Sequence, residues 1–509
     1  MGRETGTAGP NGEIVARIVI VGAGVAGLGT ALCASRSGHH VTLLERDDTP
    51  LPADPQGAFD WDRRGAPQVR HSHAFLARLR NLLRDRHPDV LAELFAAGAT
   101  EMDFIEMLPE GMDRTRMPGD EDLVAIACRR TTFEWVLRRT VLDDGSVQLR
   151  HGTAATGLRA AVGGPGGPPR VDGVLLDDGS VLDADVVVVA GGRRSDVPAM
   201  LAPLGIEVPE EVEDTGILYL SRFFQLLDGA DHPTQLGPIG GDLGYLKYGV
   251  FQGDNRTFSV TLAVGTADTE LRTLLLDPEQ FLAVAGALPA TAPYVESDRA
   301  RPITGVEVMG GLINRRRHFV DHDGVPLVLG LHAVGDAHTA TNPLYGRGCS
   351  LALVQAQLLC DVIDEFTGDH DGRARAYEAA TRAEITPWYR AALAQDRMTR
   401  QAAAHEADAG TDGRPDDDVG TAASADGGPG ADAGDFMRSL MREGLFPAMR
   451  VDPVVLRAFL RLFNLLEAPD SLMTDADVIG RVMAVYQDKD NRPPEPDLGP
   501  DRAGLLAAV

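Results

Sequence analysis

A glycine-rich turn near the N-terminus leaves few folds open to this chain. Residues 18–21 (IVIV) form a β-branched run that is typical of a buried parallel strand. The turn after this run contains Gly22, Gly24 and Gly27 in GxGxxG spacing and opens a helix predicted over 28–37. A strand, this turn and a helix in that order predict a unit that binds a dinucleotide.

Each residue type in this unit has a physical role. Gly22 permits the tight turn, Gly24 lets backbone N–H groups approach a pyrophosphate, and Gly27 lets the helix pack closely on the strand. Glu45 ends the next predicted strand and lies 45 − 27 = 18 residues past Gly27, where a carboxylate accepts the adenosine ribose hydroxyls. The site predicted for this unit comprises Gly22, Gly24, Ala26, Gly27, Glu45 and Arg46.

A second motif far downstream, AVGDAHTATNPLYGRGCS, separates FAD from NAD. The apolar run PLVLGLHAV, a predicted strand, ends at Gly335 and Asp336, and this carboxylate can accept hydrogen bonds from a ribityl chain. Pro343, Gly346 and Gly348 then turn the backbone into a new helix. The dipole of that helix would point at the flavin pyrimidine edge, where reduced flavin carries negative charge.

Charge and composition exclude several classes of function. The 509 residues include 48 Lys+Arg against 75 Asp+Glu, a net charge of −27, which disfavours binding of nucleic acid. The four cysteines form no CxxC pair, so no redox dithiol and no metal site is predicted. The N-terminus lacks the pattern of a signal peptide, and no apolar run approaches the length of a transmembrane segment. We therefore expect a cytoplasmic protein.

The fold class expected is α/β (α+β), with several domains. The expected parts are a flexible tail at 1–16, a discontinuous Rossmann-like FAD/NAD(P)-binding domain at 17–200 and 301–365, an inserted β-sheet substrate domain at 201–300, and a C-terminal helical region at 366–509. Within the last part, the acidic insert 403–435 has too few apolar residues to offset its ordering entropy, so we predict that it is disordered.

The two motifs together resemble those of FAD-dependent monooxygenases of the para-hydroxybenzoate hydroxylase fold. Four further blocks look like the bacterial branch related to squalene epoxidase and to polyether-antibiotic epoxidases of the monensin and lasalocid type: RRGAPQVRHSHAFLARLRNLL, CRRTTFEWVLRR, DADVVVVAGGRRSDV and LSRFF. The resemblance covers residues 17–400 and the last helical stretch. It implies FAD as cofactor, O2 as co-substrate, and either NAD(P)H or a separately reduced flavin, supplied by a partner reductase, as the electron source.

The resemblance also implies roles for particular residues. The glycines of the first motif would contact the pyrophosphate, Glu45 the adenosine ribose, and Arg130 the pyrophosphate or the ribityl region. Residues 335–336 would hold the ribityl chain, and the turn at 343–348 would face the isoalloxazine. The chain departs from the family at 189–192, which read Val-Ala-Gly-Gly where relatives often carry an acid or Asp-Gly. Any NADPH role of that block is therefore left open.

Candidates for the substrate pocket and for the surroundings of the flavin come from three places in the chain. A cluster near the N-terminus is either a loop near the flavin or a solvated helix start: Arg64, Gln68, Arg70, His71 and His73. A strand predicted to roof the active site carries Tyr219, Arg222, Phe223 and Phe224, and half of these must turn away because strand side chains alternate. His338 follows the ribityl-binding Asp336 and is either near the ring or structural.

The function implied by the resemblance is transfer of oxygen from a flavin C4a-hydroperoxide to a lipophilic small molecule. The substrate would be polyketide- or terpenoid-like, epoxidised or hydroxylated in natural-product biosynthesis, and no catalytic side chain is named because the chemistry is flavin-centred. Two alternatives stay open, an FAD-dependent reductase or dehydrogenase of an isoprenoid or polyketide double bond and a non-redox FAD-bound cyclase. A halogenase is disfavoured, because there is no WxWxIP block and the only two lysines, Lys247 and Lys489, are poorly placed in the sequence.

Overall fold

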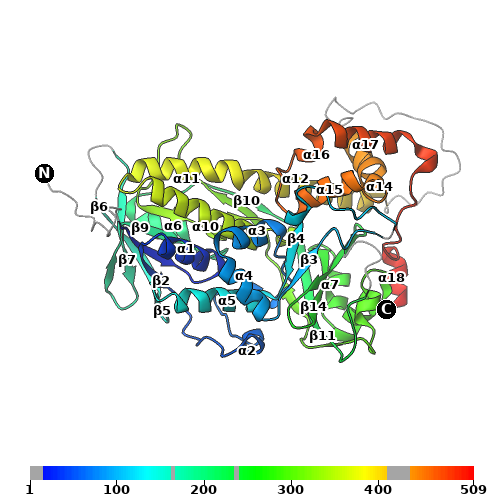
Figure 1. Cartoon of the computed structure of the whole chain (residues 1–509), viewed down its shortest axis with the longest axis horizontal. Helices are drawn as coiled ribbons and strands as arrows, with labels where there is room; N and C mark the ends of the chain where they lie inside the picture. Colours follow the sequence, from blue (N-terminus) through cyan, green and yellow to red (C-terminus); the bar gives the residue numbers. More distant parts are fainter. Residues whose placement is uncertain (1–14, 110, 162–166, 234–239, 410–435) are drawn as a thin grey trace.

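The protein is elongated, with a parallel sheet at one end of the long axis and an antiparallel sheet at the other (Figure 1). A lobe of short helices lies beside the antiparallel sheet. The computed structural model describes residues 15–109, 111–161, 167–233, 240–409 and 436–509, and the side chains of 402–409 are not described. Of the predicted tail, residues 1–14 lie outside the described residues, whereas Ala16 is buried.

The parallel sheet has the strand order β18-β9-β1-β2-β5. Its strands are β1 (Arg17–Val21), β2 (His40–Leu44), β5 (Val147–Arg150), β9 (Val186–Val189) and β18 (Leu331–Ala333), all paired in parallel. In β1, Ile18 and Ile20 face one hydrophobic core and Val19 faces another. Burial on both faces explains why this strand is apolar throughout.

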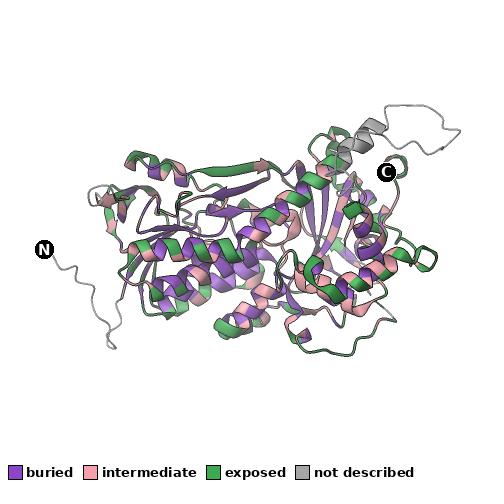
Figure 2. Ribbon diagram, turned by 90° about the horizontal axis from the view of Figure 1, so that it is seen from above, coloured by how far each residue is buried: buried purple, intermediate pink, exposed green. Residues whose placement is uncertain are grey.

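Helices cover one face of the parallel sheet and a small antiparallel sheet covers the other. The helices that pack closest to this end are α1 (Val25–Arg36), α5 (Arg130–Asp143), α10 (Gly348–Glu365) and α11 (His370–Glu384). The small sheet consists of β6 (Ala155–Ala161), β7 (Arg170–Leu176) and β8 (Val181–Asp183). Figure 2 shows buried strands and helices whose outer faces are exposed. The α/β fold class with a Rossmann-like FAD-binding domain is confirmed.

The antiparallel sheet has the order β12-β13-β14-β11-β15, and β16 also pairs with β11. Its strands are β11 (Ile217–Leu226), β12 (Gly240–Asp242), β13 (Leu246–Gln252), β14 (Thr257–Gly265), β15 (Ala300–Pro302) and β16 (Glu307–Met309). One face packs on α7 (Thr269–Leu275), α8 (Pro278–Ala287), α9 (Ala292–Val295) and the C-terminal α18 (Arg502–Ala508). The opposite face turns toward the rest of the molecule and carries part of the candidate site.

Smaller elements connect the two ends. Two further sheets are β10-β17-β19, made of β10 (Glu210–Asp214), β17 (Ile313–Arg317) and β19 (Thr339–Ala340), and the pair β3 (Thr100–Asp103) and β4 (Val124–Ala127). The remaining helices of this part are α2 (Pro55–Phe59), α3 (Ala77–Arg86), α4 (Pro88–Ala96), α6 (Val197–Leu201) and the long α12 (Thr386–Ala409).

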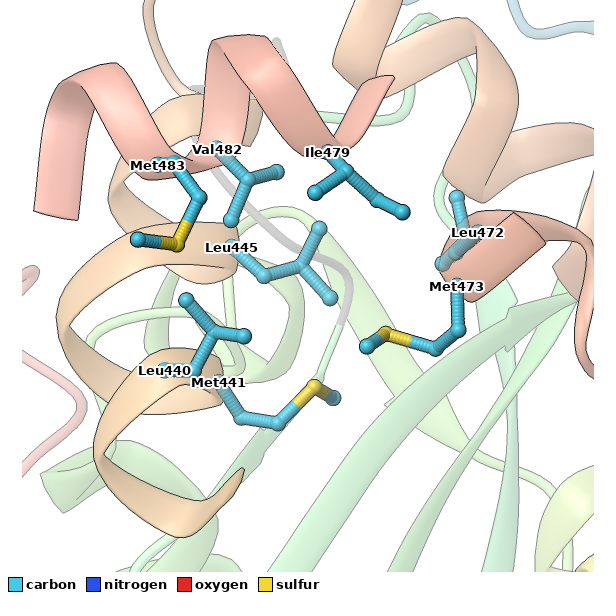
Figure 3. A pocket seen from close by; sticks show the side chains of 8 residues that line it. All are labelled: Leu440, Met441, Leu445, Leu472, Met473, Ile479, Val482 and Met483. Atoms are coloured by element: carbon cyan, nitrogen blue, oxygen red, sulfur yellow. The ribbon is translucent and has the colours of Figure 1, made fainter. Parts of the chain in front are cut away.

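The C-terminal lobe is built around its own apolar core. It contains a π-helical turn (Met441–Leu445), α14 (Phe446–Met449), α15 (Pro453–Phe463), α16 (Ser471–Thr474) and α17 (Ala476–Gln487). A hollow between these helices is lined only by apolar side chains, namely Leu440, Met441, Leu445, Leu472, Met473, Ile479, Val482 and Met483 (Figure 3). Because no polar side chain lines it, this hollow offers nothing to orient a cofactor.

Three predicted boundaries differ from the structure. Strands β15 and β16 pair with β11, so the antiparallel sheet continues to Met309 rather than ending at residue 300. The segment α18 belongs to the same end, because Leu505 is part of its core. Of the insert predicted to be disordered, residues 403–409 continue helix α12, and 410–435 lie outside the described residues.

Candidate functional site

The glycine-rich turn after β1 has no room for a side chain at two of its positions and has open space at a third. Gly22 has φ +107°, and a Cβ there would lie 2.8 Å from the Ala190 carbonyl oxygen. A Cβ on Gly27 would lie 1.9 Å from the Gly22 carbonyl oxygen, whereas one on Gly24 would meet nothing within 4 Å. Gly24 is also the N-cap of α1 and offers no side-chain cap, so the first N–H groups of the helix face this space. Such a cradle fits a phosphate.

Glu45, at the end of β2, belongs to a buried network of charges. Its Oε2 accepts hydrogen bonds from Arg63 Nη1 at 3.1 Å and Arg138 Nη2 at 3.2 Å. Both arginines also donate to the Ala23 carbonyl oxygen of the glycine-rich turn. Arg63 bonds Asp47 as well, whereas Arg46 is exposed. The carboxylate predicted to hold ribose therefore lies beside the predicted pyrophosphate cradle.

Helix α5 supplies the other half of this network. Glu134 accepts from Arg63 Nε at 2.7 Å and from Arg130 Nη2 at 3.0 Å. Arg130 also donates to the Cys349 thiol, in the first turn of α10, at 3.1 Å. The site therefore combines α5 with the N-terminal end of α10. Three arginines and three carboxylates (Arg63, Arg130, Arg138, Glu45, Asp47 and Glu134) make the network neutral.

Arg138 has donors to spare in this network. Its guanidinium and that of Arg63 stack on the Trp61 ring, with their carbons 4.8 and 5.0 Å from the ring centroid. Among the described residues, Nε and Nη1 of Arg138 are buried without a hydrogen-bond partner. Buried cationic donors of this kind are costly unless an anion satisfies them, which fits a pyrophosphate. The sequence suggested Arg130 for this role but not Arg63 or Arg138, because no local pattern marks them.

The second motif lies against the first. Gly335 has φ +60°, its N–H donates to Gln355 Oε1 at 2.7 Å, and a Cβ on it would be 2.8 Å from the Cβ of Ala26. Asp336 is partly exposed and lies 3.9 Å from the guanidinium of Arg193. The structure thus brings the residues predicted for pyrophosphate, ribose and ribityl contacts to one edge of the parallel sheet, although their contacts with FAD stay predictions.

The turn between Asn342 and Gly348 is held by a carboxylate that sequence reasoning missed. Asp396, on α12, is 4% exposed and accepts hydrogen bonds from Asn314 at 2.6 Å, Asn342 at 2.8 Å and the Tyr345 hydroxyl at 2.5 Å. The bonds tie α12 and β17 to the turn that contains Pro343. The only signal in the sequence was an acid in a long helix, which is ordinary for an exposed face.

Arg347 and the glycines complete this turn. The guanidinium of Arg347 lies between the rings of Tyr345 and Trp388, 5.0 and 4.9 Å from their centroids. Burial lowers the pKa of Arg347 to about 10. Gly346 has φ +67°, and a Cβ on it would lie 2.8 Å from the Cβ of Ala74, so the turn touches the segment 71–74. A Cβ on Gly348, the first residue of α10, would meet nothing within 4 Å.

One face of the antiparallel sheet lies toward the turn at 342–348. We call it the chamber face, and it consists of Ile217, Tyr219, Ser221, Ser259, Thr261 and Ala263. Tyr219 and Ala263 are directly opposed and form a small apolar cluster with Leu312, against which Leu344 packs. The Tyr219 ring also meets the His71 ring edge to face at 5.1 Å. Leu344 is in the turn predicted to face the flavin, so the chamber face packs against that turn.

Two of the four strand candidates lie on the wrong face, whereas Phe223 opposes Ser259 and shares the side of Tyr219. Arg222 directs its guanidinium to the carbonyl oxygens of Thr304 and Pro278, and Phe224 stacks on Phe258 in the helix-covered core. Both have even numbers on β11, like Leu218 and Leu220, whereas Tyr219 is odd. Alternation along a strand predicts two faces but does not say which one is covered by helices.

His338 is likewise misplaced as a pocket candidate. It is 2% exposed and lies near the rings of Phe319 and Tyr377, and the centroid distances are 5.7 and 6.1 Å. With these residues it lines a separate interior hollow that includes His332 and Glu378. Burial lowers the pKa of His338 to about 3, so it is neutral. The backbone turns after Asp336, so the side chain of His338 points into the core.

The cluster between Arg64 and His73 divides into two parts. Arg64 is exposed and pairs with Asp62, whereas His71 is buried beside Tyr219. His73 bonds the His71 carbonyl oxygen, and burial lowers its pKa to about 3. Gln68 and Arg70 lie in between and are partly exposed. The segment at 71–74 therefore borders the chamber face, whereas its distance from the flavin stays a prediction.

Lys247 is closer to the chamber face than its position in the sequence suggested. In the register of β13 with β14 it opposes Ala263, which in turn opposes Tyr219. Its ammonium group is paired with Asp242. Lys489 lies in a short turn after α17 in the helical lobe. A halogenase is therefore disfavoured only by the absence of the WxWxIP block and by the pairing of Lys247 with Asp242.

The site as a whole fits FAD. The cradle at Gly24 and the spare donors of Arg138 suit a pyrophosphate, Glu45 and Asp336 suit hydroxyl groups, and the turn at 342–348 opens α10 toward the chamber face. In the part of the chain that the structure describes, no group of three or more His, Cys, Asp or Glu could hold a metal ion. No helix among the described residues is long and apolar enough to cross a membrane.

Comparisons with known proteins support the same cofactor. Residues 17–91 match a family described as FAD dependent oxidoreductase. Protein Rv3254 of Mycobacterium tuberculosis (strain ATCC 25618 / H37Rv) is 31% identical over 376 residues, which are 66% of this chain and 71% of that protein.

Two solved structures have the same fold. One is PqsL, described as a probable FAD-dependent monooxygenase from Pseudomonas aeruginosa, with a TM-score of 0.55 and 18% identity over 77% of this chain and 99% of that chain. The other is the flavin-dependent brominase Bmp2, with a TM-score of 0.55 and 14% identity over 93% of this chain and 98% of that chain. At these identities the likeness shows the fold and leaves the reaction open.

Proposed function

From the premise that the chain belongs to the same family as protein Rv3254 of Mycobacterium tuberculosis and is an FAD-dependent oxidoreductase, we propose that it is a monooxygenase acting on a lipophilic small molecule. The observation that carries this proposal is the apolar packing of the chamber face against the turn at 342–348, where Tyr219 and Ala263 form one cluster with Leu344 packed against it. Oxygen transfer by a flavin needs dry, apolar surroundings of this kind more than it needs acid and base side chains.

In the proposed reaction, one oxygen atom of O2 enters the substrate and the other leaves as water. FAD held by this chain would supply the two electrons that this reduction of O2 needs, drawn from NAD(P)H or from a separate reductase. In this proposal, the residues of the chain bind and orient: Gly24 and Arg138 the pyrophosphate, Glu45 the ribose, and Asp336 the ribityl chain. Asp396 holds the turn that faces the ring.

The substrate proposed is polyketide- or terpenoid-like and is epoxidised or hydroxylated in natural-product biosynthesis. The family resemblance supports this class, and so does the apolar lining contributed by Ile217, Tyr219, Leu312 and Leu344. The probable-monooxygenase description of PqsL supports the reaction type.

The test is turnover of the purified, FAD-loaded protein under ¹⁸O2 with NADPH or NADH, and separately with a flavin reductase. We expect a product that carries one ¹⁸O atom and consumption of O2 in equal amount. Product formation in the strict absence of O2 would refute the proposal. With NADPH such a result favours the double-bond reductase, and without any reductant it favours the non-redox cyclase.

The brominase fold adds one control to this test. Bromide and chloride are added in parallel reactions, because Bmp2 has the same fold and Lys247 lies on the same side of the sheet as Tyr219. A halogenated product in place of an oxygenated one would also refute monooxygenation. We expect none, since Asp242 pairs with the ammonium of Lys247.

A further inference from the structure

The middle of the chamber face carries polar side chains, although binding of a purely apolar substrate requires none. On the helix-covered face of β14 the side chains are Phe258, Val260 and Leu262, all fully buried. On the chamber face the alternating positions are Ser259 and Thr261, which are 1% and 8% exposed. Hydroxyl side chains that are buried on a sheet face are retained when they have hydrogen-bonding partners.

These hydroxyls form an unbroken chain across three segments. Ser259 Oγ lies 2.7 Å from Ser72 Oγ, and Ser72 Oγ lies 2.6 Å from Thr261 Oγ1. Thr261 Oγ1 then lies 2.9 Å from Ser221 Oγ, which lies 3.4 Å from Nδ1 of His71. The chain therefore runs from β14 through the segment 71–74 to β11 and ends on an imidazole.

A count of hydrogens shows that this chain has one donor to spare. Four hydroxyls and one neutral imidazole carry five polar hydrogens, and the chain contains four links. If every hydroxyl donates toward His71, the spare donor is its Nε2–H. If every hydroxyl donates away from His71, Nε2 becomes an acceptor instead. The described residues supply no hydrogen-bond partner for Nε2 of His71.

His71 keeps this end of the chain uncharged. Burial alone lowers its pKa to about 4, so the ring is neutral above pH 5. None of the four hydroxyls and the imidazole carries a charge. Lys247, which opposes Ala263 in the neighbouring strand, does carry a charge, but it is paired with Asp242. Arg193, whose charge acts on Tyr219, already lies 3.9 Å from Asp336, so a carboxylate placed at Nε2 would be buried without a cation of its own. This costs several kcal/mol by the general rule for unpaired buried charges.

We propose that Nε2 of His71 hydrogen-bonds a neutral oxygen substituent of the substrate, a hydroxyl or a carbonyl, and that the chain of hydroxyls sets its direction. This inference rests on the proposed function, because the chamber face is taken as the substrate side. Reversal of the chain lets the same nitrogen donate to a carbonyl or accept from a hydroxyl. The substrate class is then an oxygenated lipophile rather than a plain hydrocarbon.

The test compares three probes of one skeleton on the FAD-loaded protein: naphthalene, 2-naphthol and 2-naphthoate. Equilibrium dialysis without reductant measures each dissociation constant, so that no turnover is involved. We expect 2-naphthol to bind most tightly. Ser221→Ala and Thr261→Val each interrupt the chain, and each should reduce the preference for 2-naphthol over naphthalene by about five-fold, as for one neutral hydrogen bond.

A matched control and a second variant keep the result interpretable. Ser146→Ala makes the same change at an exposed serine, and the preference should not change. Thr261→Val conserves side-chain shape, so a loss seen with both chain variants is not a packing defect. The proposal is overturned if the wild-type protein binds naphthalene or 2-naphthoate at least as tightly as 2-naphthol. It is equally overturned if both chain variants keep the wild-type preference.

Failure of this inference and failure of monooxygenation are separate results. A protein that prefers 2-naphthol through Ser221 and Thr261 but incorporates no ¹⁸O has the recognition site without the proposed reaction. A protein that incorporates ¹⁸O but shows no such preference has the reaction without this recognition.

Discussion

Replacement of Glu134 by glutamine tests whether the buried charge network stabilises the FAD-binding end. The Glu134 side chain is fully buried, and its carboxylate accepts from Arg63 at 2.7 Å and from Arg130 at 3.0 Å. Glutamine has nearly the same shape but no charge, and its amide N–H2 would face a guanidinium. The network of six charges would change from neutral to +1 within a region closed to water.

The size of the effect follows from the pKa of Glu134. Burial by itself raises this pKa, but the guanidinium groups of Arg63, Arg130 and Arg138 outweigh burial and lower it to about 2 from 4.5. At about 1.4 kcal/mol for each tenfold change in proton affinity, the difference is worth about 3 kcal/mol. Loss of one partner from a buried ion pair costs a similar amount, about 3–5 kcal/mol.

The direction with pH is also determined. A carboxylate whose pKa is lower in the folded chain stabilises above its unfolded value and loses that contribution as pH falls toward the folded value. The stability gap between wild type and Glu134→Gln should therefore be constant from pH 7 to about 5. It should narrow between pH 4.5 and 2, where the wild-type carboxylate is progressively protonated.

The assay is urea unfolding of the FAD-free chain, followed by tryptophan fluorescence. Two of the three tryptophans report on this region, because Trp61 stacks on Arg63 and Trp135 is adjacent to Glu134. We expect the midpoint to fall by roughly 0.5–1 M urea at pH 7, because the slope with urea increases with the size of the protein. The control is Glu101→Gln, which removes a partly exposed partner of Arg80 and should cost less than about 1 kcal/mol. Equal midpoints for wild type and Glu134→Gln would refute the reasoning.

Three shorter predictions test other parts of the site. Gly27→Ala should yield protein without bound FAD, visible as loss of the flavin absorbance, because its Cβ would lie 1.9 Å from the Gly22 carbonyl oxygen; yellow protein would contradict this. Asp396→Ala removes the acceptor of the Tyr345 hydroxyl. A fluorescence titration should show FAD binding weakened about ten-fold, which corresponds to the loss of one to two hydrogen bonds, and an unchanged affinity would contradict this. Phe224→Ala should cost about 3–5 kcal/mol of stability yet leave the 2-naphthol preference intact, and a changed preference would mean that Phe224 reaches the chamber.

The elements with strong local patterns were predictable from the sequence. The β-branched run, GxGxxG and the acid at Glu45 required only local geometry, and the structure forms β1, α1 and β2 there. The second motif was predictable for the same reason, since a turn rich in Gly and Pro must precede α10. Features that depend on backbone conformation alone can therefore be predicted without any knowledge of tertiary contacts.

The partners of those residues were not predictable, because they come from distant segments. Arg63 and Arg138 reach Glu45 from 18 and 93 positions away, and neither has a neighbour in sequence that marks it. Asp396 reaches Asn342 across 54 positions. A carboxylate in a helix is usually solvated, so only the packing of α12 on the turn shows that this one is buried.

The choice of face on β11 failed for a different reason. Tyr219 and Phe224 have equally apolar rings, and alternation places them on opposite faces whichever face is covered. The covered face is decided by α7, α8 and α18, and α18 comes from the end of the chain. A better signal was present in β14, where Ser259 and Thr261 alternate with Phe258 and Val260. Polar residues at every second position indicate which side of a buried sheet a ligand meets.

We expect the chamber face to decide which reaction this chain catalyses. PqsL and Bmp2 have the same fold, yet one is described as a probable monooxygenase and the other as a brominase, so the FAD-binding end does not choose between oxygen and halogen transfer. The choice must lie in the side chains that the chamber face and the turn present to the substrate. In this chain Asp242 pairs with Lys247, which opposes Ala263, and the chamber face contributes three hydroxyls that are bonded to Ser72 and to the neutral imidazole of His71. That arrangement can orient an oxygenated substrate but offers no unpaired amine to carry a halogen, and it therefore favours monooxygenation.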